Sequence, residues 1–156
     1  MNFDILLTKL ELYGIRGVSL NWFKTYLLGR TQSTYVNGSL SSIKTVSCGV
    51  PQGTVLGPLL FLLYINDIPN SVKNSHIKLF ADDSNLFIIG NNLLTLIDVA
   101  NHELSCLTLW LNSNKLYLNY DKTNYMLFKP KSIKSTALSD FNIKLLFNDN
   151  VIERVS

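Results

Sequence analysis

The sequence has 156 residues, of which 47% are hydrophobic and 11% aromatic. This length and composition are typical of one folded domain with a core and exclude a disordered chain. Charged residues make up 16%, and 14 Lys+Arg against 11 Asp+Glu leave a net charge of +3. Because so small an excess does not identify a nucleic-acid-binding protein, the function class must come from motifs.

Cysteine content and hydropathy exclude several further classes. Cys48 and Cys106 have neither metal-ligand spacing nor the density of a disulfide scaffold, so we expect buried thiols in an intracellular protein, nuclear or cytoplasmic. The longest apolar run, 55–65, is shorter than the roughly 20 residues that span a bilayer, and the N-terminus lacks signal-peptide features. We therefore expect no membrane partner. His76 and His102 are expected at surface or helix positions rather than at a metal.

The first third of the chain predicts two helices and a hairpin. Asp4 is expected to cap a helix whose leucines recur at helical spacing and that stops at Gly14. A second helix is predicted from Ser19 to Gly29. Asn37-Gly38, between two short β-type runs, is the strongest short signal for a β-hairpin.

The remainder of the chain predicts further helices between paired strands. A helix is expected over 58–68, with proline tolerated in its first turn, and another over 93–111, which carries an apolar stripe. The other expected segments are a hairpin around Asp82 and Asp83, a strand-turn-strand over 116–128, a basic linker over 129–136 and a last hairpin over 141–155. Trp22 and Trp110 are expected in the core. Together the segments predict an α+β sheet layered with helices.

Asp82 and Asp83 place two like charges side by side in IKLFADDSNLFIIG, residues 77–90. For such a pair alone, a turn in which aspartates accept backbone hydrogen bonds is the commoner explanation. The flanking apolar runs, however, predict strands that hold the turn rigidly, and the two carboxylates repel unless solvent or a cation offsets the charge. Mg²⁺ binds one or two carboxylates plus substrate phosphates in phosphoryl and nucleotidyl transfer.

A second motif, CGVPQGTVLGPLLFLLYINDIP, starts at Cys48. Gly49, Gly53 and Gly57 with Pro51 make a rigid loop that has few side chains and enters a helix. On its own, this loop is equally well explained as a plain strand-to-helix connection. Glycines also let a backbone approach a nucleotide closely, and Gln52 has an amide suited to a base or ribose.

The two motifs together resemble the reverse transcriptase of non-LTR retrotransposons, of the LINE or jockey-like group. The resemblance extends over nearly the whole chain, through DILLTKLELYGIRG, WFKTYLLGRTQSTYVNG, GVPQG, FADD, LTLWLNSNKLYLNYDKTNYMLF and IKLLFNDNVIERVS. It implies a polymerase palm, an antiparallel sheet backed by helices, with part of the fingers and truncated at both ends. The implied organisation is one partial domain over 1–156: fingers and palm elements in 1–48, the palm core in 49–128, and a linker and the start of the primer-grip region in 129–156.

The resemblance implies roles for individual residues at the hairpin and beyond. Asp82 would be a catalytic metal ligand and Asp83 a weaker or supporting one, with Mg²⁺ or Mn²⁺ as the cofactor. Lys122 would be a general acid near the pyrophosphate, although a solvated turn lysine is an equal alternative. Arg30 and Gln32 would approach the template or nucleotide, with a plain surface charge as the alternative for Arg30.

The same resemblance implies a pocket for the incoming nucleotide and its template base, lined by Gly49, Val50, Pro51, Gln52, Gly53, Phe80 and Ala81. Phe80 stands where many relatives have tyrosine. The implied reaction adds deoxynucleoside triphosphates to the 3′-hydroxyl of a DNA primer on an RNA template by a two-metal mechanism. The implied partners are these substrates and the rest of the retrotransposon polyprotein.

The chain departs from the family at its start. There the first metal-binding aspartate belongs to a strand ending in a phrase like AFDTVNHDILL, whereas this chain begins MNFDILL, so that Asp4 aligns with the later aspartate. We therefore expect Asp4 to be non-catalytic and the chain alone to polymerise little or not at all. The alternative is an inactive remnant or a nucleic-acid-binding module. The end, VIERVS, falls where the family continues into the primer-grip hairpin and thumb.

Overall fold

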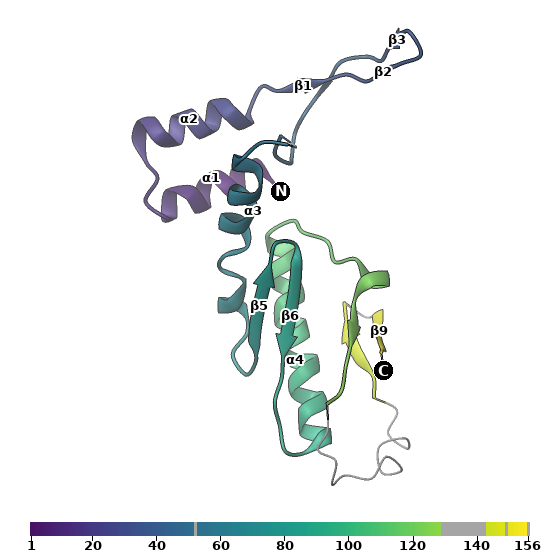
Figure 1. The fold of residues 1–156 in the computed structure, drawn as a ribbon. Helices are drawn as coiled ribbons and strands as arrows, with labels where there is room; N and C mark the ends of the chain where they lie inside the picture. The colour runs from purple at the N-terminus through teal and green to yellow at the C-terminus, as the bar shows by residue number, and fades with distance from the viewer. Residues whose placement is uncertain (52, 129–142, 149, 156) are drawn as a thin grey trace. The chain divides into compact units, whose positions relative to one another are not determined.

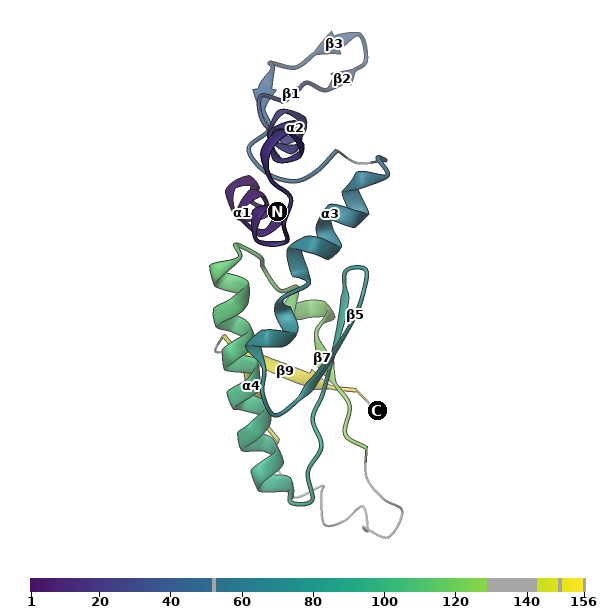
Figure 2. The ribbon, with the colours of Figure 1, turned by 90° about the vertical axis from the view of Figure 1, so that its left-hand side faces the viewer.

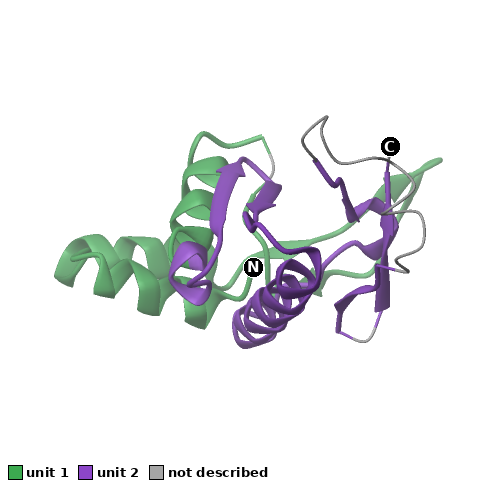
Figure 3. Cartoon of the chain, turned by 90° about the horizontal axis from the view of Figure 1, so that it is seen from below, with its two compact units in different colours: residues 1–67 green, residues 68–156 purple. Residues whose placement is uncertain are grey.

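The computed structural model describes residues 1–51, 53–128, 143–148 and 150–155 (Figure 1). The chain forms two compact units, residues 1–67 and residues 68–156, which are coloured separately in Figure 3 and are described one at a time. Helices and small, mainly antiparallel sheets make up the described residues, which confirms the predicted α+β class. The predicted linker at 129–136 lies outside the described residues.

Unit 1 is built on three helices, with α1 packed against the other two. They are α1 (Phe3–Leu12), α2 (Gly17–Leu27) and α3 (Leu56–Ile65), and their fully buried leucines include Leu6, Leu10, Leu27 and Leu60. The cap of α1 is Asn2, whose side chain accepts a hydrogen bond from the Ile5 N–H at 3.1 Å. The predicted cap was therefore wrong, because Asp4 lies in the first helical turn.

The other two helices of unit 1 differ from the prediction at their ends. α2 begins two residues earlier than predicted, at Gly17, and Gly29 follows its end with a φ of 72°. α3 ends at Ile65 instead of Ile68. Pro69 accounts for this early end, since a proline has no N–H with which to donate to the carbonyl of Ile65, four residues earlier. The chain continues as a short 3-10 helix, η1 (Ile68–Ser71), in unit 2.

A buried lysine ties α1 to the end of α3. The Lys9 ammonium donates to the Tyr64 carbonyl and to the Asp67 carboxylate, both at 2.6 Å, and lies 5.1 Å from the centre of the Tyr64 ring. The Tyr64 hydroxyl accepts a hydrogen bond from the Asn2 N–H at 3.3 Å. Burial raises the pKa of Tyr64, the Asn2 bond lowers it and the charge of Asp67 raises it, for a net increase. These contacts fix the N-terminus of the chain on α3.

Between α2 and α3 the chain forms an extended ribbon, residues 30–46. Within the ribbon, β1 (Thr31–Gln32) pairs with β4 (Lys44–Thr45), and β2 (Tyr35–Val36) pairs with β3 (Ser39–Leu40), both antiparallel. Asn37 and Gly38 form the connecting turn with φ values of 48° and 81°, which confirms the hairpin predicted there. Every residue from 31 to 45 is exposed.

Unit 2 packs one long helix against a hairpin and a small sheet. Figures 1 and 2 show α4 beside the hairpin, which confirms the helix and both hairpins predicted for this part of the chain. The elements are β5 (His76–Phe80), β6 (Asp83–Phe87), α4 (Leu93–Ser113), β7 (Asn124–Tyr125), β8 (Leu145–Phe147) and β9 (Asn150–Arg154). β5 pairs antiparallel with β6, while β9 lies between β7 and β8, parallel to β7 and antiparallel to β8.

The core of unit 2 gathers around the apolar stripe of α4. Leu104 and Leu107 of α4 pack with Phe147, Ile152 and Ile68. The partly buried side chains packed on this cluster include Ile77, Leu79 and Leu86 of the hairpin and Trp110. The predicted stripe of α4 and the core position of Trp110 are thereby confirmed.

Trp22 was wrongly placed in the core, since 52% of its surface is exposed. Leu20 and Leu27, seven positions apart, mark the buried side of α2, and Trp22 projects about 200° around the helix from Leu20. It stacks instead on Tyr26, with ring centroids 5.4 Å apart and planes at 11°. Cys48 is likewise exposed rather than buried, while Cys106 is half-buried and its Sγ lies 3.8 Å from His102 Nε2.

The strand-turn-strand predicted over 116–128 is only partly present. Its first half is irregular and leads into a 3-10 helix, η2 (Tyr120–Lys122), before the short strand β7. The Leu116 N–H donates to the Leu111 carbonyl at 2.9 Å, so this segment begins by closing the end of α4 and not as a strand. Among the described helices, none is long and apolar enough to span a bilayer.

Candidate active site

The two adjacent aspartates lie at the tip of the β5–β6 hairpin. Phe80 pairs with Asp83 across the ladder, so that Ala81 and Asp82 form a two-residue turn. Ala81 has a φ of 52°, a conformation that the first central residue of a tight hairpin turn needs and that glycine adopts more easily. The inward-facing Ile77, Leu79 and Leu86 pack on the core and hold this turn. The strands predicted on both sides of the aspartates are confirmed.

Neither the Asp82 nor the Asp83 carboxylate forms an ion pair or hydrogen bond with the residues that the structure describes, and both residues are exposed. Asp83 projects from the solvent side of the hairpin with Phe80, which is 81% exposed. Two unbonded carboxylates are the oxygen donors that Mg²⁺ uses together with substrate phosphates, so their chemistry fits that ion. Within the described ranges, however, no group of three or more His, Cys, Asp or Glu side chains could hold a metal.

The opposite end of β5 is anchored by a buried carboxylate that the sequence did not reveal. Glu103 of α4 is 1% exposed and accepts hydrogen bonds from the backbone N–H groups of Lys73 and Asn74 at 2.9 and 3.2 Å. It also accepts from the Asn74 amide at 3.3 Å and the Ser75 hydroxyl at 2.7 Å. Burial raises the pKa of Glu103, but these four hydrogen bonds outweigh it and the net pKa is lowered.

The glycine-rich motif forms a loop in unit 1 that enters α3. Gly49 and Gly53 have φ values of 82° and 74°, which explains why glycine occupies both positions. The Gly49 N–H donates to the Met1 carbonyl at 2.8 Å, and Val50 and Pro51 are half-buried. Gln52, whose amide we expected to contact a base or ribose, lies outside the described residues.

Thr54 holds this loop in place, a role that was not predicted. Its hydroxyl donates to the Pro51 carbonyl at 2.8 Å and accepts from the Gly57 N–H at 3.2 Å and the Tyr26 hydroxyl at 3.1 Å. The one donor and two acceptor positions of a threonine hydroxyl are thus all in use. Gly57 is buried against the loop, where an added Cβ would lie 3.3 Å from the Pro51 carbonyl oxygen. The spacing of Thr54 and Gly57 was the sequence signal for this role, because a threonine near the start of a helix often accepts a hydrogen bond from the N–H group three residues later.

The remaining predicted site residues lie apart from these features in the chain. Lys122 is exposed in η2, and in the described part of the molecule it forms no ion pair with Asp82 or Asp83. Arg30 belongs to unit 1; its Nη1 is buried and has no hydrogen-bond partner among the described residues. The hairpin aspartates belong to unit 2 and the glycine loop belongs to unit 1. The geometry of each part of the predicted site is therefore given within its own unit.

Comparisons with known proteins point to one family. The model of the family described as reverse transcriptase (RNA-dependent DNA polymerase) matches residues 1–142. An RNA-directed DNA polymerase from the mobile element jockey of Drosophila melanogaster is 29% identical over 106 residues, 64% of this chain and 12% of that protein. A probable RNA-directed DNA polymerase from transposon X-element of Drosophila melanogaster is 42% identical over 64 residues, 38% of this chain and 7% of that protein.

A third relative, a probable RNA-directed DNA polymerase from transposon BS of the same fly, is 29% identical over 117 residues, 70% of this chain and 13% of that protein. No solved structure matches the chain significantly. The matched regions cover only about an eighth of the length of the jockey and BS proteins, so the chain spans a small part of these relatives. The resemblance predicted from the sequence motifs is confirmed.

Proposed function

Because the chain belongs to the reverse transcriptase (RNA-dependent DNA polymerase) family, we propose that it supplies part of the polymerase site of a non-LTR retrotransposon. The observation that carries this proposal is the Asp82–Asp83 pair, which is exposed, unbonded among the described residues and mounted on a hairpin packed against the core. Neither carboxylate accepts a hydrogen bond from a residue that the structure describes, so a turn-forming role does not explain the pair.

The proposal assigns the chain to the palm with part of the fingers. Residues 49–128 are the palm core, 1–48 carry fingers and palm elements, and 129–156 form a linker and the start of the primer-grip region. Asp82 holds a metal ion, Asp83 supports it, and Lys122 donates a proton to the leaving pyrophosphate. Mg²⁺ or Mn²⁺, when bound, supplies the positive charge that activates a primer hydroxyl and stabilises the triphosphate.

Substrate contacts are proposed for the glycine loop and the hairpin tip. Gly49, Val50, Pro51, Gln52 and Gly53, together with Phe80 and Ala81, border the incoming nucleotide and its template base. The φ values of Gly49 and Gly53 and the Thr54 hydrogen bonds support this role, because they fix a backbone that has few side chains to obstruct a ligand. The proposed partners are an RNA template, a DNA primer, deoxynucleoside triphosphates and the rest of the element's polyprotein.

A second candidate function is a nucleic-acid-binding module without polymerase activity, as in a decayed copy of the element. It is favoured by one observation: within the described residues, Asp82 and Asp83 have no further carboxylate or histidine beside them with which to complete a metal site. A two-metal mechanism needs a ligand that both ions share. We therefore expect the 156-residue chain by itself to extend primers little or not at all.

The test is primer extension on an RNA template by the longest translated product of the element that contains this segment. With Mg²⁺ or Mn²⁺ present, we expect extension that Asp82→Ala reduces at least about 100-fold, because changes even to the outer shell of metal sites cost 10- to 100-fold. Asp98→Ala is the matched control, since it removes an exposed carboxylate of the same unit from α4.

Two results would contradict the proposal. Extension that survives Asp82→Ala would show that the hairpin carboxylates are not the metal ligands. Absence of extension in the longer product, with nucleic-acid binding retained, would favour the binding module instead.

A further inference from the structure

The turn at the tip of the ribbon joins an asparagine to a glycine. Asn37 and Gly38 connect β2 to β3 with φ values of 48° and 81°, and the sequence contains no other Asn-Gly dipeptide. In such a dipeptide, the side-chain amide carbon of the asparagine and the backbone nitrogen of the next residue can close a five-membered ring. Glycine has no Cβ to obstruct that ring. The turn therefore contains an electrophile and a nucleophile side by side.

Both reacting groups are free of hydrogen bonds in the part of the chain that the structure describes. There the Asn37 side chain forms none, and the Gly38 N–H donates to no carbonyl. A Cβ built at Gly38 would meet no atom within 4 Å, so the approach to its nitrogen is open. Asn74 is also exposed, but its side chain donates to Glu103 Oε1 at 3.3 Å and its N–H to the same oxygen at 3.2 Å. Exposure alone thus does not leave an asparagine of this chain free.

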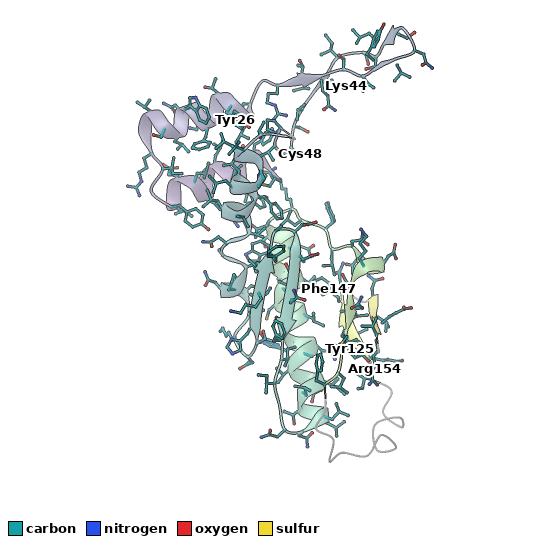
Figure 4. All side chains as sticks on the ribbon, viewed as in Figure 1. Tyr26, Lys44, Cys48, Tyr125, Phe147 and Arg154 are labelled. Carbon is teal, nitrogen blue, oxygen red and sulfur yellow. The ribbon has the colours of Figure 1, made fainter. Side chains whose placement is uncertain are left out.

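Little in the ribbon holds the turn closed. Two residue pairs, Tyr35 with Leu40 and Val36 with Ser39, join β2 to β3, and every residue from 31 to 45 is exposed. Figures 1 and 4 show this hairpin extending away from the helices of unit 1, beyond the labelled Lys44. A two-stranded hairpin without a core is marginally stable at best, so it opens at little cost in free energy. Ring closure needs the asparagine backbone to leave the turn conformation, and this opening permits that movement.

We propose that Asn37 and Gly38 form a self-modifying site, at which Asn37 is converted to aspartate and isoaspartate without an enzyme. In an intramolecular step, the Gly38 nitrogen attacks the side-chain carbonyl carbon of Asn37, and the bond from that carbon to the amide nitrogen breaks. The amide nitrogen leaves as ammonia, taking the proton of the Gly38 nitrogen, and a succinimide ring remains. Water then opens the ring at one of its two carbonyls. The overall reaction consumes one water and releases one ammonia, and it needs no oxidant or metal.

The two products affect the ribbon differently. Both add a negative charge to a stretch, residues 12–66, that otherwise has no aspartate or glutamate. The aspartyl product keeps the turn, because Asp-Gly is also favoured in two-residue hairpin loops. The isoaspartyl product routes the main chain through the side chain, which lengthens the loop by one atom and removes the register that a two-residue turn sets. The isoaspartyl form therefore separates β2 from β3. This inference does not rely on the proposed function.

The test follows the 156-residue chain by peptide mapping and mass spectrometry during incubation at slightly alkaline pH. Replacement of a side-chain NH₂ by OH identifies each converted asparagine, and a parallel sample in concentrated guanidinium chloride gives the rate for the unfolded chain. Asn37 should react no more than about tenfold slower in the folded chain than in the unfolded one, because the ribbon opens easily. Asn74, compared in the same way, should be protected at least about 100-fold by its bonds to Glu103.

Asn37→Gly is the matched control, because it removes the side-chain amide and leaves a Gly-Gly dipeptide that suits the same turn. Circular dichroism verifies that this variant is folded. Radiolabelling by an isoaspartate-specific carboxyl methyltransferase should detect isoaspartate in the unchanged protein after incubation. In Asn37→Gly the label should fall to the level of the protein before incubation.

Two results would overturn the inference. One is protection of Asn37 in the folded chain by more than about tenfold, since the turn would then be held closed. The other is as much isoaspartate in Asn37→Gly as in the unchanged protein, since the modified residue would then lie elsewhere. Neither measurement uses a metal, a primer or a template. Primer extension without isoaspartate would therefore refute this site alone, and isoaspartate without extension would refute the polymerase alone.

Discussion

At the scale of single residues, Glu103 is the side chain whose replacement should be most informative. Gln at position 103 would direct an amide N–H₂ toward groups that already donate, so at least one buried donor would lose its acceptor. We expect Glu103→Gln to lower the free energy of unfolding by about 1–3 kcal/mol. Urea denaturation measures this, with the exposed Glu153→Gln as a control that should change little.

The same carboxylate makes stability depend on pH. The pKa of Glu103 is lower in the folded protein than its usual value of 4.5, so the charged form stabilises the fold above pH 4.5. That contribution is lost as the pH falls from 4.5 through the lower folded pKa. Thermal melting between pH 3 and 6 should therefore show a steeper acid-side decline in the unchanged protein than in Glu103→Gln. Parallel curves for the two proteins would refute this role.

Ala81 should respond to substitution in a way that an ordinary hairpin alanine would not. Its φ of 52° is costly for any residue with a Cβ and most costly for a β-branched one. We expect Ala81→Val to destabilise the chain by about 1–2 kcal/mol. Ala81→Gly should be neutral or stabilising by up to about 1 kcal/mol, since relief of strain offsets the entropy of glycine in the unfolded chain. Melting temperatures that rank valine above glycine would contradict the left-handed conformation.

Sequence reasoning found the residues whose signals are local and missed those whose partners are distant. The hairpin at Asp82 and Asp83 was predicted because the neighbouring residues in the chain define the turn. Glu103 lies about 30 positions from the N–H groups that it binds, and no short spacing marks that pairing. Thr54 was missed in part for the same reason, since Tyr26 is 28 positions away.

At the scale of elements, α4 gives the clearest test of the packing. Leu107 is buried in the core of unit 2, whereas Leu109 of the same helix is 66% exposed. Leu107→Ala should cost about 2–4 kcal/mol, because it removes buried methyl groups and leaves a cavity. Leu109→Ala should change the free energy of unfolding by less than about 0.5 kcal/mol. Equal effects of both substitutions in urea denaturation would refute the assigned buried face.

Elements with one strong local signal were predicted best. The apolar stripe of α4 and the Asn37-Gly38 turn each specify their structure by a local pattern, and both were confirmed. The predicted strand after α4 failed because Leu116 closes the helix, a contact that competes with strand pairing. The cap of α1 lies two residues earlier than predicted, because Asn2 and not Asp4 occupies the capping position. Neither competition is visible in the hydropathy pattern.

At the scale of the whole molecule, composition predicted one folded chain but not its division into two units. The overall charge of +3 gave no indication of a binding surface. That average conceals a stretch from residue 12 to 66 without any acidic residue, whereas both aspartates of the hairpin belong to unit 2. The family assignment depended on the order and spacing of motifs, which composition does not record.

The exposed ribbon also affects how the isolated chain behaves at high concentration. Tyr35, Val36 and Leu40 present apolar side chains on a two-stranded ladder whose outer backbone groups have no strand beside them in the described residues. Such edges act as templates for pairing with another chain. Purified samples should therefore self-associate through the ribbon as the protein concentration rises.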